Sequence, residues 1–248
     1  MTTGRLARIF RHPVKGIGNE ALEAAALSPE GALAGDRAWA LLTDAAPDCD
    51  AWQPRRNFLQ VASGPRLAAV TARSDGDAVV LSHPDRPDFR LTGVADGPAL
   101  GDWLAPLWPA ERPAPARLVR APGHGMTDMP DPFVSLGNLS SLRALSQRAG
   151  RDLDPRRFRI NLWIDGLAPW EEFDLIDTNL ALGAAALAVA ERIGRCRAPE
   201  ADPATGRRDV DICRVLDAGW GHTDFGVYCR VTEGATVRPG DALAPAER

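Results

Sequence analysis

Glycine and proline interrupt this chain at short intervals from one end to the other. Its 248 residues include 23 glycines and 21 prolines. Because both residues terminate regular structure, this spacing predicts many short strands joined by turns rather than long helices. The length suggests one large domain or two small ones.

Strand signals recur along the sequence. Residues 5–14 and 37–43 are strand candidates, and residues 68–84 have the pattern of a hairpin with Asp75-Gly76 at its turn. Residues 225–243 alternate apolar runs with turn residues, which is typical of a small β-barrel that closes near its C-terminus.

Two segments have the periodicity of helices, and a third is ambiguous. Residues 97–108 and 138–150 each place large apolar side chains on one face. Residues 181–194 are rich in alanine, which favours a helix. Their alternating Leu, Val and Ile equally permit two strands around Gly183.

The segment 105–123 differs from its surroundings. Five prolines and several charges interrupt the apolar pattern there. We therefore expect a boundary between two domains in this segment.

Charge and hydropathy exclude several classes of function. The formal net charge is −4, and no basic tract offers a footprint for nucleic acid or for an anionic membrane. No apolar run reaches the roughly 18 residues of a membrane-spanning helix, and residues 1–16 lack the apolar core of a signal peptide. The sequence predicts a cytoplasmic protein with no nucleic-acid or membrane partner.

The four cysteines are too few and too scattered for a disulfide scaffold. No CxxC pair is present, which argues against a zinc ribbon or an iron–sulfur cluster. Cys213 and Cys229 lack a cationic or turn context, so we expect inert core thiols. Cys49 lies in a polar stretch and is expected to be exposed.

Residues 194–209 hold the densest run of unusual residues. Cys196 lies between Arg195 and Arg197, and positive neighbours favour the thiolate, the form that attacks electrophiles or binds a soft metal. The turn sequence Asp-Pro-Ala-Thr-Gly follows, so the cysteine could face a pocket. The alternative is a half-buried cysteine beside two solvated arginines.

Six short motifs extend this pattern over nearly the whole chain. In order they are Pro13-Val14-Lys15-Gly16, Gly35-Asp36-Arg37-x-Trp39, Phe158-Arg159-x-Asn161, Cys196-x5-Asp-Pro-x-Thr-Gly, Phe225-Gly226-x-Tyr228 and Val237-x-Pro239-Gly240-Asp241. Each is weak alone. In this series they resemble the MOSC family (molybdenum cofactor sulfurase C-terminal domain) with its N-terminal β-barrel domain, in the branch of the mitochondrial amidoxime reducing component and its bacterial relatives.

The resemblance implies a mainly β fold with a few helices. An N-terminal β-barrel-like domain would cover about residues 1–110, and a MOSC β-barrel domain about residues 115–248. The cofactor would lie in the cleft between them. Residues 179–194 would then be strands that lead to Cys196, against their helix propensity.

The resemblance also implies a molybdenum cofactor, Mo-molybdopterin. Cys196 would be the metal ligand and the catalytic residue, and the pterin dithiolene would add two sulfurs. Pyridoxal phosphate, which is associated with the family, is not expected here. A phosphate and a polar pterin need cations and amide groups around them. Carried over from the family, the cofactor-binding residues are Lys15, Gly16, Arg37, Arg159, Asn161, Gly194, Arg195 and Tyr228.

Each of these positions also has a plain structural alternative. Lys15, the only lysine of the chain, and Arg37 could be solvated surface cations. Arg159 and Asn161 could form the exposed face of a strand. Tyr228, the only tyrosine, could pack in a barrel core.

Four loop residues complete the set of candidates. His124 and His222 lie in Gly-rich loops and could approach a substrate, or be ordinary loop histidines. We expect Asp202 and Thr205 only to hold their turn.

The implied activity is reduction of N-hydroxylated small molecules such as amidoximes, hydroxylamines or N-hydroxy bases. Oxygen-atom transfer to molybdenum would use electrons from a separate donor protein of the ferredoxin or flavoprotein type. Two alternatives use the same residues: a carrier or insertion protein for molybdenum cofactor, and a sulfur carrier in which Cys196 bears a persulfide. Measurement of turnover distinguishes the carrier from the reductase, because a carrier does not reduce an N-hydroxylated substrate.

Overall fold

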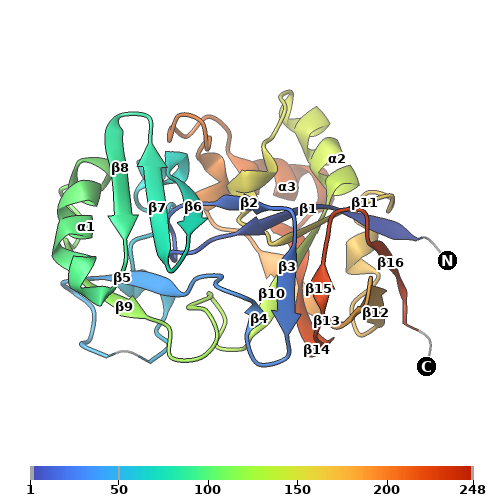
Figure 1. Ribbon diagram of the computed structural model, residues 1–248. Coiled ribbons are helices and arrows are strands. Elements are labelled where there is room, and N and C mark those ends of the chain that lie inside the picture. The colour runs from blue at the N-terminus through green and yellow to red at the C-terminus, as the bar shows by residue number, and fades with distance from the viewer. Residues whose placement is uncertain (1–2, 50, 247–248) are drawn as a thin grey trace.

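A closed β-barrel of seven strands dominates the computed structural model, which describes residues 3–49 and 51–246 (Figure 1). The ring closes because β1 pairs with both β16 and β11. All neighbouring strands are antiparallel except β10 and β11. The expected mainly β fold is confirmed. In order around the barrel, the strands are β1 (Gly4–Arg11), β11 (Leu162–Asp165), β10 (Phe133–Asn138), β14 (Asp224–Glu233), β13 (Ala185–Gly194), β12 (Asn179–Leu182) and β16 (Ala242–Pro245).

Alternating burial explains why the alanine-rich segment forms strands. In β13, Leu187, Val189 and Ile193 are buried, and most of the residues between them are half-buried or exposed. Gly183, with φ +57°, makes the turn that pairs β12 with β13. The strands expected over residues 179–194 are confirmed, because tertiary burial outweighs helix propensity.

An N-terminal lobe (residues 39–120) packs beside the barrel, at the left of Figure 1. The predicted hairpin is confirmed as β6 and β7, with Gly76 at φ +61° in its turn. The lobe contains β5 (Trp39–Thr43), β6 (Thr71–Asp75), β7 (Ala78–His83), β8 (Arg86–Leu91), α1 (Gly97–Leu104) and β9 (Pro115–Arg120). The remaining short strands are β2 (Glu20–Leu22), β3 (Ala25–Ser28), β4 (Ala32–Leu33) and β15 (Thr236–Val237).

The segment 105–123, where we expected the domain boundary, contains a strand. Its β9 pairs with β5, and the proline at the first position of β9 costs no ladder hydrogen bond there. Conversely, β1 completes the C-terminal barrel. The division into domains of residues 1–110 and 115–248 therefore stays a proposal. In it, β1 of the first part pairs with strands of the second, and β9 of the second part pairs with β5 of the first.

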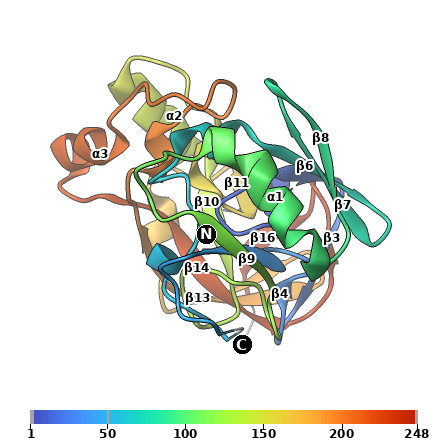
Figure 2. The same ribbon diagram turned by 90° about the vertical axis from the view of Figure 1, so that its left-hand side faces the viewer.

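Helices cover one side of the barrel, and sequence reasoning found two of the three. Figure 2 shows α2 (Leu139–Ala149) and α3 (Ile212–Trp220) together, with α1 across β9. The missed helix, α3, begins at an Asp211 cap and ends at Gly221 with φ +72°. Its apolar residues Ile212, Val215, Leu216 and Trp220 have helical spacing, so the sequence carries a signal that could have found it. No helix in the described parts of the chain is both long and apolar enough to cross a membrane.

Two glycines let the barrel and the lobe approach closely. A Cβ on Gly206 would lie 2.7 Å from the Arg66 Cα, and a Cβ on Gly16 would lie 2.3 Å from the Leu59 carbonyl oxygen. Both glycines also have positive φ, +66° and +71°. The last residue of the Asp-Pro-Ala-Thr-Gly turn thus fixes the lobe against the loop that follows Cys196.

Gly206→Ala should destabilise the protein more than Gly76→Ala. Both positions have φ above +60°, so both substitutions cost about 1–2 kcal/mol of backbone strain. Only Gly206 lacks room for a Cβ, whereas nothing lies within 4 Å of a Cβ on Gly76. We expect an additional loss of about 1–3 kcal/mol for Gly206→Ala, measured by urea unfolding. Equal losses would contradict the close approach.

Candidate functional site

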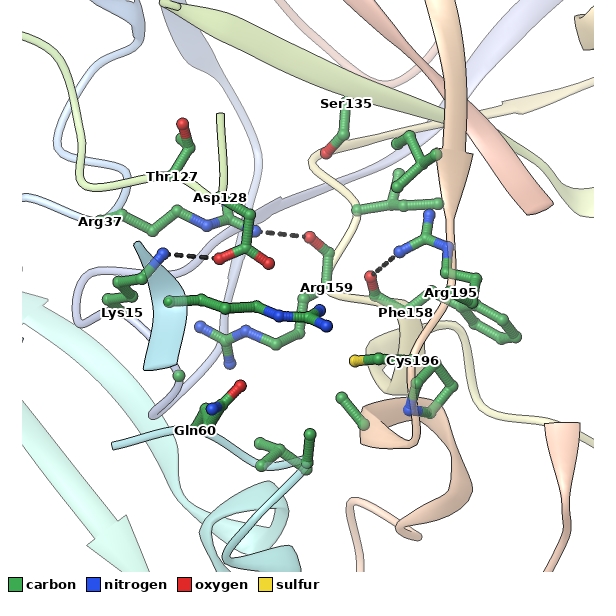
Figure 3. A pocket seen from close by; sticks show the side chains of 18 of the residues that line it. Lys15, Arg37, Gln60, Thr127, Asp128, Ser135, Phe158, Arg159, Arg195 and Cys196 are labelled. Atoms are coloured by element: carbon green, nitrogen blue, oxygen red, sulfur yellow. Dashed lines mark hydrogen bonds and ion pairs between the residues drawn. The ribbon is translucent and has the colours of Figure 1, made fainter. Parts of the chain in front are cut away.

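A cavity between the barrel and the N-terminal lobe collects every residue that the resemblance singled out (Figure 3). They come from the segment after β1, the loop before β5, the turn before β11, the end of β13, and β14. Their roles toward a cofactor stay a proposal. The nine residues are Lys15, Gly16, Arg37, Arg159, Asn161, Gly194, Arg195, Cys196 and Tyr228.

The cavity wall is strongly cationic although the whole chain is acidic. Asp128 is the single carboxylate among its described lining residues. Six cationic side chains line it: Lys15, Arg37, Arg55, Arg157, Arg159 and Arg195. Lys15, Arg37 and Arg157 pair with Asp128, Asp36 and Asp209, whereas the other three cations have no carboxylate within 4.0 Å in the described chain. The excess positive charge attracts an anionic ligand.

Two of these guanidiniums are held by backbone carbonyls. Arg159 donates to the Gly18 oxygen (2.9 Å) and the Val14 oxygen (3.2 Å). Arg195 donates to the Phe158 oxygen (2.9 Å) and, through Nε, to the Phe225 oxygen (2.9 Å).

No carboxylate in the described chain lies within 4.0 Å of either guanidinium. Burial lowers the pKa of Arg159 to about 9 and that of Arg195 to about 10. Both remain charged at neutral pH, so each carries a positive charge that the protein does not neutralise by contact.

The backbone is strained at two of the arginines. Arg37 has φ +48° and Arg159 has φ +51°, in the left-handed region that residues other than glycine rarely adopt. The Arg37 amide donates to the His12 carbonyl oxygen (2.7 Å), and Arg37 Nη2 donates to the Arg159 carbonyl oxygen (2.8 Å). Asp36, which is buried, pairs with the Arg37 guanidinium. Strain that its surroundings maintain in this way is concentrated at binding sites.

Lys15 is buried, so the surface alternative is wrong for it. Its Nζ lies 2.6 Å from Asp128 Oδ1, and its side chain is only 5% exposed, against 52% for Asp128. Burial lowers the pKa of Lys15, and the Asp128 carboxylate partly opposes this shift. Sequence reasoning missed Asp128. It lies in the irregular loop before β10, and none of the motifs includes it.

The Cys196 thiol points into the cavity from the loop after β13 (Figure 3). Cys213 is not the core thiol that we expected. It is half-buried on the first turn of α3, where its Sγ lies 3.4 Å from the Arg195 carbonyl oxygen and 3.5 Å from the Cys196 carbonyl oxygen. Cys213 therefore supports the backbone that presents Cys196.

Arg159 and Asn161 lie in a turn, not on a strand. The turn links the 3-10 helix η5 (Pro155–Phe158) to β11. Asn161 is 2% exposed, its Oδ1 accepts from Ser135 Oγ (2.8 Å) and its Nδ2 donates to the Phe10 oxygen (3.1 Å). Most of its hydrogen-bonding capacity joins the turn before β11 to β10 and β1, and one amide hydrogen remains for a ligand.

Tyr228 lines the cavity instead of filling the barrel core. Its ring stacks on Phe133, with centroids 5.5 Å apart. Burial raises the pKa of Tyr228, so the phenol remains protonated at neutral pH and can donate a hydrogen bond.

The remaining candidates lie outside the cavity lining. His124 contacts the Gly125 carbonyl oxygen, and His222 packs edge-on against Trp170. Cys229 is a buried core thiol, as expected, and burial raises its pKa to about 12. Cys49 is exposed, also as expected.

The Asp-Pro-Ala-Thr-Gly loop is held by its own residues. The Asp202 carbonyl oxygen accepts from the Gly206 amide (2.7 Å), and its Oδ1 accepts from the Ala204 amide (2.9 Å). This geometry agrees with the structural role expected for Asp202.

The described residues contain no group of three or more His, Cys, Asp and Glu side chains that could hold a metal ion. A metal bound at Cys196 would therefore take its other ligands from a cofactor, substrate or water. A soft thiolate beside a cationic wall suits a metal that arrives with anionic ligands.

Two family models match the chain in series. Residues 3–99 match the MOSC N-terminal beta barrel domain, and residues 124–244 match the MOSC domain. No protein with a curated description matches.

Among solved structures, the chain is similar to the YuaD protein from Bacillus subtilis, with 11% identity, 97% of this chain and 94% of that chain covered, and a TM-score of 0.47. It is also similar to YiiM from Geobacillus stearothermophilus, with 20% identity, coverages of 46% and 54%, and a TM-score of 0.34.

The single lysine allows a direct test of the buried ion pair. With 13C-labelled lysine, NMR should show one side-chain signal whose titration midpoint lies below the ordinary value for lysine. Asp128→Asn removes the charge that raises the Lys15 pKa, so the midpoint should move to still lower pH. Asp131→Asn is the matched control, because Asp131 belongs to the same loop but pairs with Arg230. An unchanged midpoint in Asp128→Asn would refute the pairing.

Proposed function

Because the chain belongs to the MOSC-domain family and carries its N-terminal MOSC β-barrel domain, we propose that the cavity binds molybdenum cofactor and that the protein reduces N-hydroxylated compounds. The observation that carries the proposal is the pair of buried guanidiniums without carboxylate partners, Arg159 and Arg195. They lie in the same cavity as the Cys196 thiol. Together they fit an anionic ligand that brings a soft metal.

The residues present fit Mo-molybdopterin chemically. Its phosphate would interact with the cations of the wall, and Lys15 and Arg159 would meet its anionic or polar parts. The free amide hydrogen of Asn161 and the Tyr228 hydroxyl would meet polar pterin atoms. Gly16 and Gly194 would admit the ligand near the backbone.

The bound cofactor would supply a redox-active metal for cleavage of an N–O bond. Cys196 would provide the protein thiolate that anchors the metal. The Cys213 contacts and the Asp202 loop would fix the position of that thiolate. The six cations would hold the ligand's charge and orient it, so that the substrate reaches the metal from the open side.

The reaction consumes two electrons and two protons for each substrate. The N–O bond breaks, one proton adds to the nitrogen, and the other adds to the hydroxyl oxygen, which leaves as water. The protonated Tyr228 phenol lines the same cavity and can donate a hydrogen bond to a substrate oxygen. Electrons would come from a separate donor protein.

Analysis of the purified protein tests the proposal first. After expression in a molybdate-fed host, we expect molybdenum and pterin near one equivalent each, and reduction of benzamidoxime by the loaded protein with a chemical reductant. Absence of both metal and pterin would overturn cofactor binding. A loaded protein that transfers its cofactor to an apo-enzyme but reduces nothing would identify a carrier.

Lys15→Ala and Arg159→Ala should each lower cofactor occupancy without unfolding the protein. A lost charge-assisted hydrogen bond is worth about 1.5–3 kcal/mol, or roughly ten- to a hundredfold in affinity. Arg8→Ala is the control, because Arg8 is an exposed cation of β1 outside the cavity lining. Unchanged occupancy in both cavity variants would show that these residues do not bind the cofactor.

Cys196→Ser should separate metal chemistry from pterin binding. A serine hydroxyl is nearly isosteric but is a hard, weakly acidic ligand, so it would replace the thiolate poorly on molybdenum. We expect pterin to stay bound while N-reduction falls at least a hundredfold (about 2.7 kcal/mol) and the metal's absorption spectrum changes. Cys49→Ser, at an exposed cysteine, should behave like the wild type. Full activity of Cys196→Ser would remove the proposed metal ligand.

A further inference from the structure

Six exposed arginines belong to segments that line or flank the cavity. They come from three separate parts of the chain: the 3-10 helices η1 (Arg55–Asn57) and η2 (Pro65–Ala69) of the lobe, the residue after Cys196, and the end of the Asp-Pro-Ala-Thr-Gly loop. We call this set the arginine rim. Its members are Arg55, Arg56, Arg66, Arg197, Arg207 and Arg208, all of them exposed.

Contacts across the junction bring these segments together. Arg208 Nη2 donates to the Ala62 carbonyl oxygen (2.6 Å), and Ala62 itself lines the cavity. The Arg208 and Arg197 guanidiniums both pair with Glu200, at 3.1 and 3.0 Å. These contacts join Arg197 and Arg208, on the barrel side, to the lobe near Cys196. The Arg66 backbone lies against Gly206 in the same loop as Arg207 and Arg208.

The rim carries more charge than its own carboxylates neutralise. Glu200 and Asp85 are the only carboxylates of the described chain within 4.0 Å of its six guanidiniums. Arg55, Arg56 and Arg207 have no carboxylate within that distance. Since the whole chain carries −4, the positive patch stands out from an otherwise acidic surface.

Most of the rim lies outside the cavity lining. Of its members, only Arg55 is among the cavity-lining residues. The other five are exposed, so their charge is available to a partner outside the cavity.

We propose that the arginine rim is the docking surface for a small acidic redox protein that delivers electrons to the site. This inference rests on the proposed function, which requires a separate donor. Two reduced one-electron donors would dock in turn, and each would give one electron. With two protons, these electrons break the N–O bond and release water.

The observations favour an acidic protein over nucleic acid. Val94, at 57% exposure, is the only exposed large hydrophobic residue of the described chain, so the rim offers no exposed aromatic ring on which bases could stack. Its charge is also interrupted by Glu200 and Asp85, whereas a phosphate backbone is followed by an uninterrupted groove. A compact acidic partner needs only a local patch, which steers association at low ionic strength.

Charge reversal tests the surface. Arg56→Glu/Arg207→Glu changes two rim residues that lie outside the cavity lining, and Arg8→Glu/Arg238→Glu makes the same change of net charge on exposed arginines of the barrel. The donor probe is a reduced plant-type [2Fe–2S] ferredoxin, a small acidic protein. Its oxidation by the cofactor-loaded protein is followed by stopped flow with excess benzamidoxime.

We expect the rim variant to lower the second-order rate constant ten- to a hundredfold at low salt, and the barrel variant to change it less than threefold. At 0.5 M NaCl the difference should largely vanish, because salt screens exposed charges. Equal losses in both double variants, or no loss in the rim variant, would overturn the docking surface. Tight binding of an oligothymidine at low salt that depends on the rim arginines would also overturn the docking surface.

A small uncharged reductant separates this proposal from the proposed function. Photoreduced 5-deazariboflavin should drive amidoxime reduction equally in all three loaded proteins. If the loaded wild type reduces nothing with deazaflavin, the proposed function fails and the docking inference fails with it. If deazaflavin supports turnover but the rate of ferredoxin oxidation is the same in the wild type and the rim variant, only the docking proposal is overturned.

Discussion

The site depends on arginine side chains that bond to backbone carbonyl oxygens. Arg159 reaches from the turn before β11 to the Val14 and Gly18 oxygens, and Arg195, which follows β13, reaches the Phe158 oxygen of η5 and the Phe225 oxygen of β14. A carbonyl accepts the hydrogen bonds of a guanidinium without cancelling its charge. The same contacts therefore fix the walls of the cavity and leave them positive, which a carboxylate partner would prevent.

The closed barrel explains how residues so far apart in the sequence reach one cavity. β1 pairs with β11 and β16, which places the segment that follows it, with Lys15 and Gly16, beside the turn that carries Arg159. β13 and β14 are neighbours, so Cys196 and Tyr228 meet from opposite directions along the chain. Glycine at position 206 then lets the lobe close the open side.

The spacing of glycine and proline predicted many short strands, and the family resemblance implied both the fold class and the residues that the structure brings to the cavity. Sequence reasoning missed Asp128, α3 and β9. Asp128 has no motif, and only the fold brings it to Lys15. α3 has helical spacing in the sequence but was not predicted, and β9 follows prolines that suggest a linker. For residues 179–194 the propensity favours a helix; the family resemblance implied the strands, and burial of alternate residues on one barrel face explains them.

The fold also gives a physical reason for the lysine at position 15. It is the only lysine of the chain, which otherwise uses arginine for its permanently charged basic residues. The ammonium lies 2.6 Å from one acceptor, Asp128, and 5.5 Å from the centroid of the Phe58 ring. A guanidinium has five donors in a planar fork and would leave several of them unpaired in this buried space. A compact ammonium with one carboxylate partner fits the space. Since Asp128 is half exposed, that ammonium can still be shared with an anionic ligand entering the cavity.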